Sequence, residues 1–75
     1  MQWVPVSSSN VAAIAYDSRE KLLYVQFHSG SVYVYYDVPP QVYLSFVNAP
    51  SKGQFVWRVL RNQGRDNAYR YSRVA

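Results

Sequence analysis

The stretch that decides the fold is Gly30-Ser31-Val32-Tyr33-Val34-Tyr35-Tyr36-Asp37-Val38-Pro39-Pro40. It starts with a residue suited to a tight turn and continues as a run of β-branched and aromatic residues that favours a strand. It ends in two prolines that favour the first turn of a helix. This stretch therefore predicts a hairpin turn, the strand that follows it and the passage from sheet to helix.

Two more strands are expected before this stretch. Residues 10–16 are small and apolar, residues 17–20 form a polar turn, and residues 22–27 are a second apolar run. Together with residues 31–36 they predict a three-stranded antiparallel meander, because segments joined by short turns usually pair in sequence order.

The turn at residues 28–30 sets the register of the hairpin. A three-residue loop puts only Gly30 at positive φ, as a G1 bulge, whereas a two-residue loop would also put Ser29 there. We therefore expect Val25 to pair with Tyr33. One face of the sheet then carries Leu23, Val25, Phe27, Tyr33 and Tyr35, and the other carries Leu22, Tyr24, Val32, Val34 and Tyr36.

Two short helices are expected after the meander. The prolines at 39–40 open the first, which ends before Pro50, and Ser51 and Gln54 form a capping box at the start of the second. Gly64 closes the second helix. The apolar stripes expected to face the core are Val42, Tyr43, Phe46, Val47 and Ala49 in the first helix and Phe55, Val56, Val59 and Leu60 in the second. The opposite side of the second helix is expected to carry Trp57, Arg58, Arg61 and Arg65.

The C-terminal segment leaves one element open. Residues 67–73 alternate as a strand does, so they form either a fourth strand on a sheet edge or a loose tail. The sequence thus predicts one α+β domain over residues 1–75, with a three-stranded meander, and with or without that fourth strand, against two short helices. Both sheet faces are apolar and two helices can cover only one. We therefore expect a homo-oligomer such as a dimer.

Several spaced segments of the chain resemble the KTSC domain. They are Ser8-Ser9-Asn10-Val11, Ile14-Ala15-Tyr16-Asp17, Leu23-Tyr24-Val25-Gln26-Phe27, Gly30, Tyr33-Val34-Tyr35, Val38-Pro39, Tyr43 and Ala49-Pro50-Ser51-Lys52-Gly53. This family is named for its place at the C-terminus of some lysyl-tRNA synthetases, and it also occurs as a small bacterial or phage protein. Tyr33 and Tyr35 form its most characteristic motif. The resemblance covers roughly residues 6–61, and the association with the synthetase suggests RNA binding.

The inventory of reactive side chains argues against catalysis. The chain has no cysteine, one histidine and four carboxylates, and His28 lies in a predicted turn without an evident partner. We expect no enzyme activity, no metal site and no cofactor. The serines at 7–9 either donate to a phosphate or bond the local backbone. Without cysteines, a signal sequence or a membrane-length apolar run, the chain is expected in the cytoplasm with no membrane partner.

The charge is concentrated in the last third of the chain. Residues 1–50 hold two basic and three acidic side chains, whereas residues 51–75 hold six basic and one acidic. This asymmetry predicts an anionic partner, although a solvated cationic face would also keep a small protein soluble.

Aromatic and basic residues alternate in this cationic third, which is typical of single-stranded nucleic-acid binding. The candidate contacts for nucleic acid or phosphate are Trp57, Arg58, Arg61, Arg65, Tyr69, Arg70, Tyr71 and Arg73. Tyr33 and Tyr35 are expected in the core instead, and replacing Arg58 and Arg61 is expected to leave the fold intact. Three functions stay open: a module that binds RNA or other single-stranded nucleic acid, an oligomer that traps a small nucleotide, and a protein-interaction or assembly module.

Overall fold

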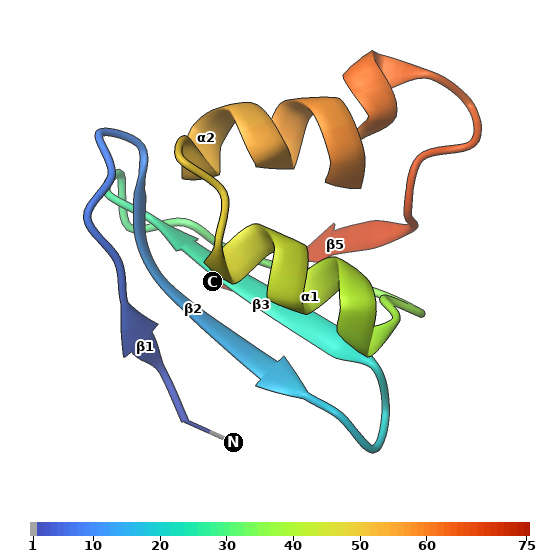
Figure 1. Ribbon diagram of the computed structural model, residues 1–75, viewed down its shortest axis with the longest axis horizontal. Coiled ribbons are helices and arrows are strands. Elements are labelled where there is room, and N and C mark those ends of the chain that lie inside the picture. The colour runs from blue at the N-terminus through green and yellow to red at the C-terminus, as the bar shows by residue number, and fades with distance from the viewer. Residues whose placement is uncertain (1) are drawn as a thin grey trace.

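A computed structural model describes residues 2–75 and contains one five-stranded antiparallel sheet in the order β1-β2-β3-β4-β5 (Figure 1). The strands are β1 (Val4–Pro5), β2 (Val11–Asp17), β3 (Leu22–Phe27), β4 (Val32–Tyr35) and β5 (Tyr71–Arg73). The predicted α+β class is confirmed, but the prediction of three or four strands was too low. The C-terminal segment does form a strand, and β1 was missed. With two residues and a proline, β1 is too short to alternate, although proline suits an edge strand.

The hairpin between β3 and β4 has the predicted register. Val25 lies opposite Tyr33, and the Phe27 amide donates to the Ser31 carbonyl at 2.9 Å. Gly30 has a φ of +98°, as a G1 bulge requires. The predicted turn chemistry therefore accounts for which side chains of β4 face the core.

The helical part begins and ends at the predicted residues but is less regular than expected. Helix α1 (Pro40–Val47) begins at the proline pair, and α2 (Lys52–Phe55) follows Ser51, whose hydroxyl accepts a hydrogen bond from the Gln54 amide at 3.3 Å. Helix α2 continues without a break into the π-helical turn η1 (Val56–Leu60), and the short 3₁₀ turn η2 (Asn62–Gly64) ends the segment. The π turn gave no signal in the sequence.

Both helical segments cover the same face of the sheet (Figure 1). The core between the two layers consists of Val11, Ile14, Leu23, Val25, Tyr35, Val38, Phe46, Val56 and Leu60. Val47 and Val59, which the predicted apolar stripes included, are exposed at 41% and 38%. The apolar stripes are therefore narrower than predicted.

Among residues 2–75, no helix lies over the other face of the sheet (Figure 1). Trp3 beside β1 and Val74 beyond β5 are exposed at 44% and 53%, and the Trp3 ring lies edge-on to Tyr24 with 6.3 Å between the ring centroids. The expectation that the helices cover only one face is met, whereas the expected homo-oligomer stays a prediction.

Candidate functional site

The eight candidate contact residues do not form one surface. Trp57, Arg58 and Arg65 are exposed around η1 and the turn that follows it. Trp57 is 52% exposed, and a β-carbon placed on Gly64 would lie 3.4 Å from Cη2 of its indole. The indole thus lies against the η2 turn, and this contact holds it in place while about half of it remains open to solvent.

Arg61 does not share this exposed side, so its predicted position beside Trp57 and Arg58 was wrong. Its Nε donates to the Tyr35 hydroxyl at 3.2 Å. Its guanidinium carbon lies 5.1 Å from the centroid of the Tyr33 ring and 4.5 Å from that of Tyr71. The prediction placed residues around a regular α-helix. In the structure the Arg61 amide donates a hydrogen bond to the Val56 carbonyl, five residues earlier, at 2.8 Å. This π-helical bond widens the turn, and the Arg61 side chain therefore points in another direction than on a regular α-helix.

The four residues Tyr33, Tyr35, Arg61 and Tyr71 form what we call the arginine–tyrosine cluster. Tyr35 is fully buried and Tyr33 is half-buried, in agreement with their expected place in the core. Burial raises the pKa of the Tyr35 hydroxyl, while the hydrogen bond and charge of Arg61 oppose that rise. The cluster joins η1 to β4 and β5, so its first role is structural.

The remaining candidate residues mainly attach the C-terminal segment to the domain. Tyr69 is half-buried against the core, and its amide donates to the Leu60 carbonyl at 3.1 Å. The Arg70 guanidinium lies 4.9 Å from the Tyr36 ring centroid and 3.7 Å from Asp37. Arg70 therefore lies directly before β5, next to the point where Tyr69 bonds Leu60, and already has an acidic partner.

Arg73 is also engaged within the chain. Its Nε donates to the Ala75 carbonyl at 2.9 Å, and its backbone pairs with Tyr33 across the β4–β5 ladder. Of the predicted contacts, Arg58 and Arg65 are exposed arginines with no bond assigned within residues 2–75, and Trp57 is the half-exposed aromatic residue that precedes Arg58. Arg58 also lines a shallow hollow with Pro50, Ser51 and Phe55.

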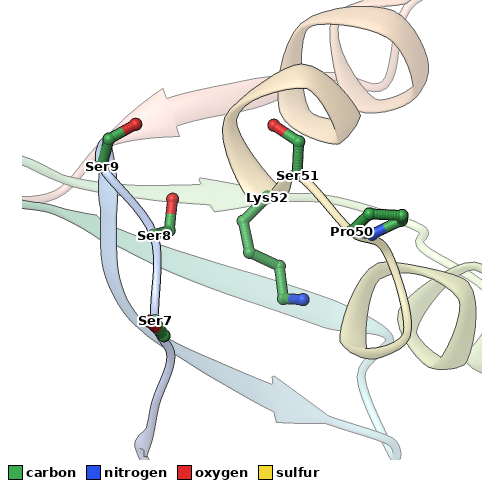
Figure 2. A pocket seen from close by; sticks show the side chains of 6 residues that line it. All are labelled: Ser7, Ser8, Ser9, Pro50, Ser51 and Lys52. Atoms are coloured by element: carbon green, nitrogen blue, oxygen red, sulfur yellow. The ribbon is translucent and has the colours of Figure 1, made fainter.

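A polar pocket of about 400 Å³ lies elsewhere on the surface, between the β1–β2 connection and the start of α2 (Figure 2). It is lined by Ser7, Ser8, Ser9, Pro50, Ser51 and Lys52. The sequence analysis considered the serines alone and did not join them to Lys52. The family resemblance could have indicated that these serines and Lys52 belong to one site, because residues 8–11 and residues 49–53 are both among the segments that resemble the KTSC domain.

Within the part of the chain that the structure describes, no cluster of three or more histidine, cysteine or acidic side chains could hold a metal ion. Among the same residues no helix is long and apolar enough to cross a membrane.

Comparison with known proteins identifies the family. The model of the KTSC domain matches residues 7–63. A protein of Tsukamurella paurometabola is 44% identical over 52 residues, which make up 69% of this chain and 78% of that protein. The crystal structure of a KTSC domain protein from Yersinia pestis matches with a TM-score of 0.81 at 30% identity, over 99% of this chain and 97% of that one.

A larger enzyme also contains a similar region. A lysine–tRNA ligase of Nostoc punctiforme is 46% identical over 46 residues, which make up 61% of this chain but only 8% of the ligase. The similar region is thus a small part of that enzyme, whereas it is most of the present chain. The family match spans the meander, both helical segments and the polar pocket, and by this match the chain belongs to the KTSC domain family.

Proposed function

We propose that this chain is a non-enzymatic RNA-binding module of the cytoplasm that contacts single-stranded segments through Trp57, Arg58 and Arg65. The observation that carries the proposal is the half-exposed indole held against the η2 turn, with exposed arginines at the next position in sequence and directly after that turn. A base stacked on an aromatic side chain gains about 1–3 kcal/mol, and arginine binds phosphate through paired N–H groups.

The state of the two arginines supports an anionic partner. Within residues 2–75 neither Arg58 nor Arg65 forms an ion pair. Both are exposed, so a phosphate could reach them without breaking an existing contact. Arg61, Arg70 and Arg73 already bond within the chain, and the proposed interface is accordingly smaller than the cationic third of the sequence.

The relatives suggest which RNA to test first. The ligase of Nostoc punctiforme is named for its action on tRNA, and 8% of it resembles this chain. We therefore propose tRNA and short single-stranded RNA as the first ligands. The lack of cysteine in the chain fits a reducing compartment such as the cytoplasm.

The test is fluorescence anisotropy with labelled single-stranded RNA, duplex RNA and tRNA at several salt concentrations. The double variant Arg58→Gln/Arg65→Gln should weaken binding and lower the slope of log affinity against log salt by roughly one per lost phosphate contact. The matched control is Arg19→Gln/Lys21→Gln, which removes the same charge from the exposed turn between β2 and β3.

Trp57→Ala is the second variant. It should weaken binding to single strands more than to duplexes, because stacking needs an unpaired base. If the wild-type protein shows no salt-dependent binding to any of these RNAs, or if the control pair weakens binding as much as the test pair, the proposal is wrong.

Assembly is a second candidate function, favoured by the sheet face that carries Trp3, Tyr24 and Val74. Two large side chains of this face are exposed in the single chain, and a second copy would bury them. Sedimentation velocity tests it: a dimer at micromolar concentration that Trp3→Lys converts to monomer supports assembly, and a monomer at high micromolar concentration contradicts it.

A further inference from the structure

We propose that the polar pocket between the β1–β2 connection and α2 binds the phosphoryl group of a phosphate monoester. None of Trp57, Arg58 and Arg65 lines this pocket, and the proposal does not depend on the proposed RNA binding. Its lining residues come from residues 7–9 and 50–52. Figure 2 shows Ser9 and Ser51 on opposite walls with their hydroxyls directed toward the gap, and the Lys52 side chain extending along it.

The charge of Lys52 is the first reason to expect an anion. Its side chain is half-buried, and its Nζ donates to the Ala49 carbonyl at 2.6 Å. Within residues 2–75 no carboxylate pairs with it, and no acidic residue lines the pocket. An ammonium group has three N–H donors and is costly to bury without a partner of opposite charge. A bound anion would supply that charge.

The hydroxyl groups are the second reason. The Ser8 oxygen accepts hydrogen bonds from the amides of Asn10 and Val11, both at 3.2 Å. Its two lone pairs are thus engaged, which leaves its O–H as a donor. The Ser51 oxygen likewise accepts from the Gln54 amide. The pocket therefore offers mainly donors, and a ligand rich in acceptors matches it.

The two hydrogen bonds that the Ser8 oxygen accepts from the backbone are those that a purely structural serine would make. They do not explain why the Ser9 hydroxyl and the charged Lys52 side chain lie at the same pocket. Nor do they compete with a ligand, because they use the lone pairs of Ser8 and leave its proton free. The two readings of residues 7–9 considered from the sequence, local bonding and donation to phosphate, are compatible in this structure.

The two walls are held together independently of any ligand. A β-carbon on Gly53 would lie only 2.6 Å from Nδ2 of Asn10, so a residue without a side chain is needed for this close approach. Behind the wall, Nε2 of His28 contacts the Ser8 carbonyl at 2.9 Å. The donors are therefore positioned before binding, which lowers the entropic cost of capturing a ligand.

The size and composition of the pocket limit the ligand. Its volume of about 400 Å³ is near the lower end for small-molecule sites. Apart from Pro50 its lining is polar, and no aromatic side chain offers a surface for a base. The pocket therefore suits the phosphate end of a molecule, whether that is a free sugar phosphate or the 5′ end of an RNA.

The first experiment titrates the folded wild-type protein with inorganic phosphate and follows amide chemical shifts by NMR. Shifts should be confined to the amides of residues 7–10 and 51–53 and should saturate. Binding of a phosphate monoester such as ribose 5-phosphate should strengthen between pH 5 and pH 7, because its second ionisation has a pKa of about 6. Shifts that are spread over all cationic surfaces, or that never saturate, overturn the proposal.

Two variants test the named donors. Lys52→Gln keeps a donor for the Ala49 carbonyl but removes the charge, and it should weaken phosphate binding about tenfold or more. Ser9→Ala removes a hydroxyl with no structural bond assigned to it, so it should fold normally and weaken binding several-fold. Lys21→Gln is the matched control for charge and should bind as the wild type does. Unchanged affinity in both test variants would refute the site.

Two further ligands identify the source of the phosphate. Ribose 5-phosphate that binds as well as a 5′-phosphorylated oligonucleotide indicates a free monoester. A 5′-phosphorylated oligonucleotide that binds more tightly than both ribose 5-phosphate and its own 5′-hydroxyl form indicates an RNA end. In the second case Arg58→Gln/Arg65→Gln should leave the binding of inorganic phosphate unchanged. Loss of RNA binding in this variant and loss of phosphate binding in the pocket variants therefore test the two proposals separately.

Discussion

Removing the guanidinium of Arg61 should destabilise the fold, contrary to the expectation from sequence that this residue is dispensable for folding. In Arg61→Met the aliphatic part of the side chain is kept, but the hydroxyl of the fully buried Tyr35 loses its partner at 3.2 Å. A buried hydroxyl left unpaired costs about 1–3 kcal/mol. Loss of the contacts with the Tyr33 and Tyr71 rings adds about 0.5–1 kcal/mol each.

The expected loss in the free energy of unfolding is therefore about 2–5 kcal/mol. A domain of 75 residues has a total stability of about 4–11 kcal/mol, so this loss is a large share. It should appear in urea denaturation as a lower midpoint, and in thermal denaturation as a Tm lower by about 10–40 °C. Arg58→Met, which removes an exposed arginine from the same helical segment, should change the stability by less than about 0.5 kcal/mol.

A double variant separates the hydrogen bond from the packing. Tyr35→Phe removes the buried hydroxyl, so adding it to Arg61→Met removes the unpaired group and should recover part of the lost stability. If the free energy of unfolding of Arg61→Met lies within about 0.5 kcal/mol of the wild-type value, the arginine–tyrosine cluster does not hold the helical segment to the sheet and this reasoning is wrong.

Three further predictions follow from single residues. Because burial raises the pKa of the Tyr35 hydroxyl above its ordinary value of about 10, folding favours its protonated form. The contribution of this group to stability should be constant below about pH 10 and be lost as the pH rises further, and Tyr35→Phe should reduce the loss of stability that urea titrations measure at high pH. Gly30→Val should lower the Tm through backbone strain alone, because φ is +98° and nothing lies within 4 Å of the added β-carbon; an unchanged Tm would contradict the assigned turn. Gly53→Ala should lower the Tm because the added β-carbon crowds Asn10. The double variant Gly53→Ala/Asn10→Ala should recover part of the lost stability, and thermal denaturation of the two variants and the wild type can check this.

The parts of the fold that sequence predicts are those fixed by local chemistry. Gly30 sets the hairpin register because a G1 bulge needs positive φ, and the proline pair at 39–40 starts α1 for a similarly local reason. Strand β1 could not be predicted, because its two residues become a strand only by pairing with β2.

The candidate site was less predictable because it depends on tertiary contacts. The direction of Arg61 follows from a π turn that no residue pattern predicts, and this one change places a predicted RNA contact against Tyr33, Tyr35 and Tyr71. The polar pocket depends on Gly53 approaching Asn10 across 43 positions of sequence. Sequence reasoning identified the serines of one wall as candidate phosphate donors but could not place Lys52 opposite them.

The end of the family match at residue 63 gives a way to rank the two proposed sites. The polar pocket, Trp57 and Arg58 lie inside the match, whereas Arg65 lies outside it. We therefore expect a function shared by the family to depend on residues 7–63 more than on Arg65. Arg58→Gln should consequently weaken RNA binding more than Arg65→Gln if RNA is the shared ligand. If only Arg65→Gln weakens it, RNA binding rests on a residue outside the match, and the pocket at Lys52 becomes the better candidate for what the family has in common.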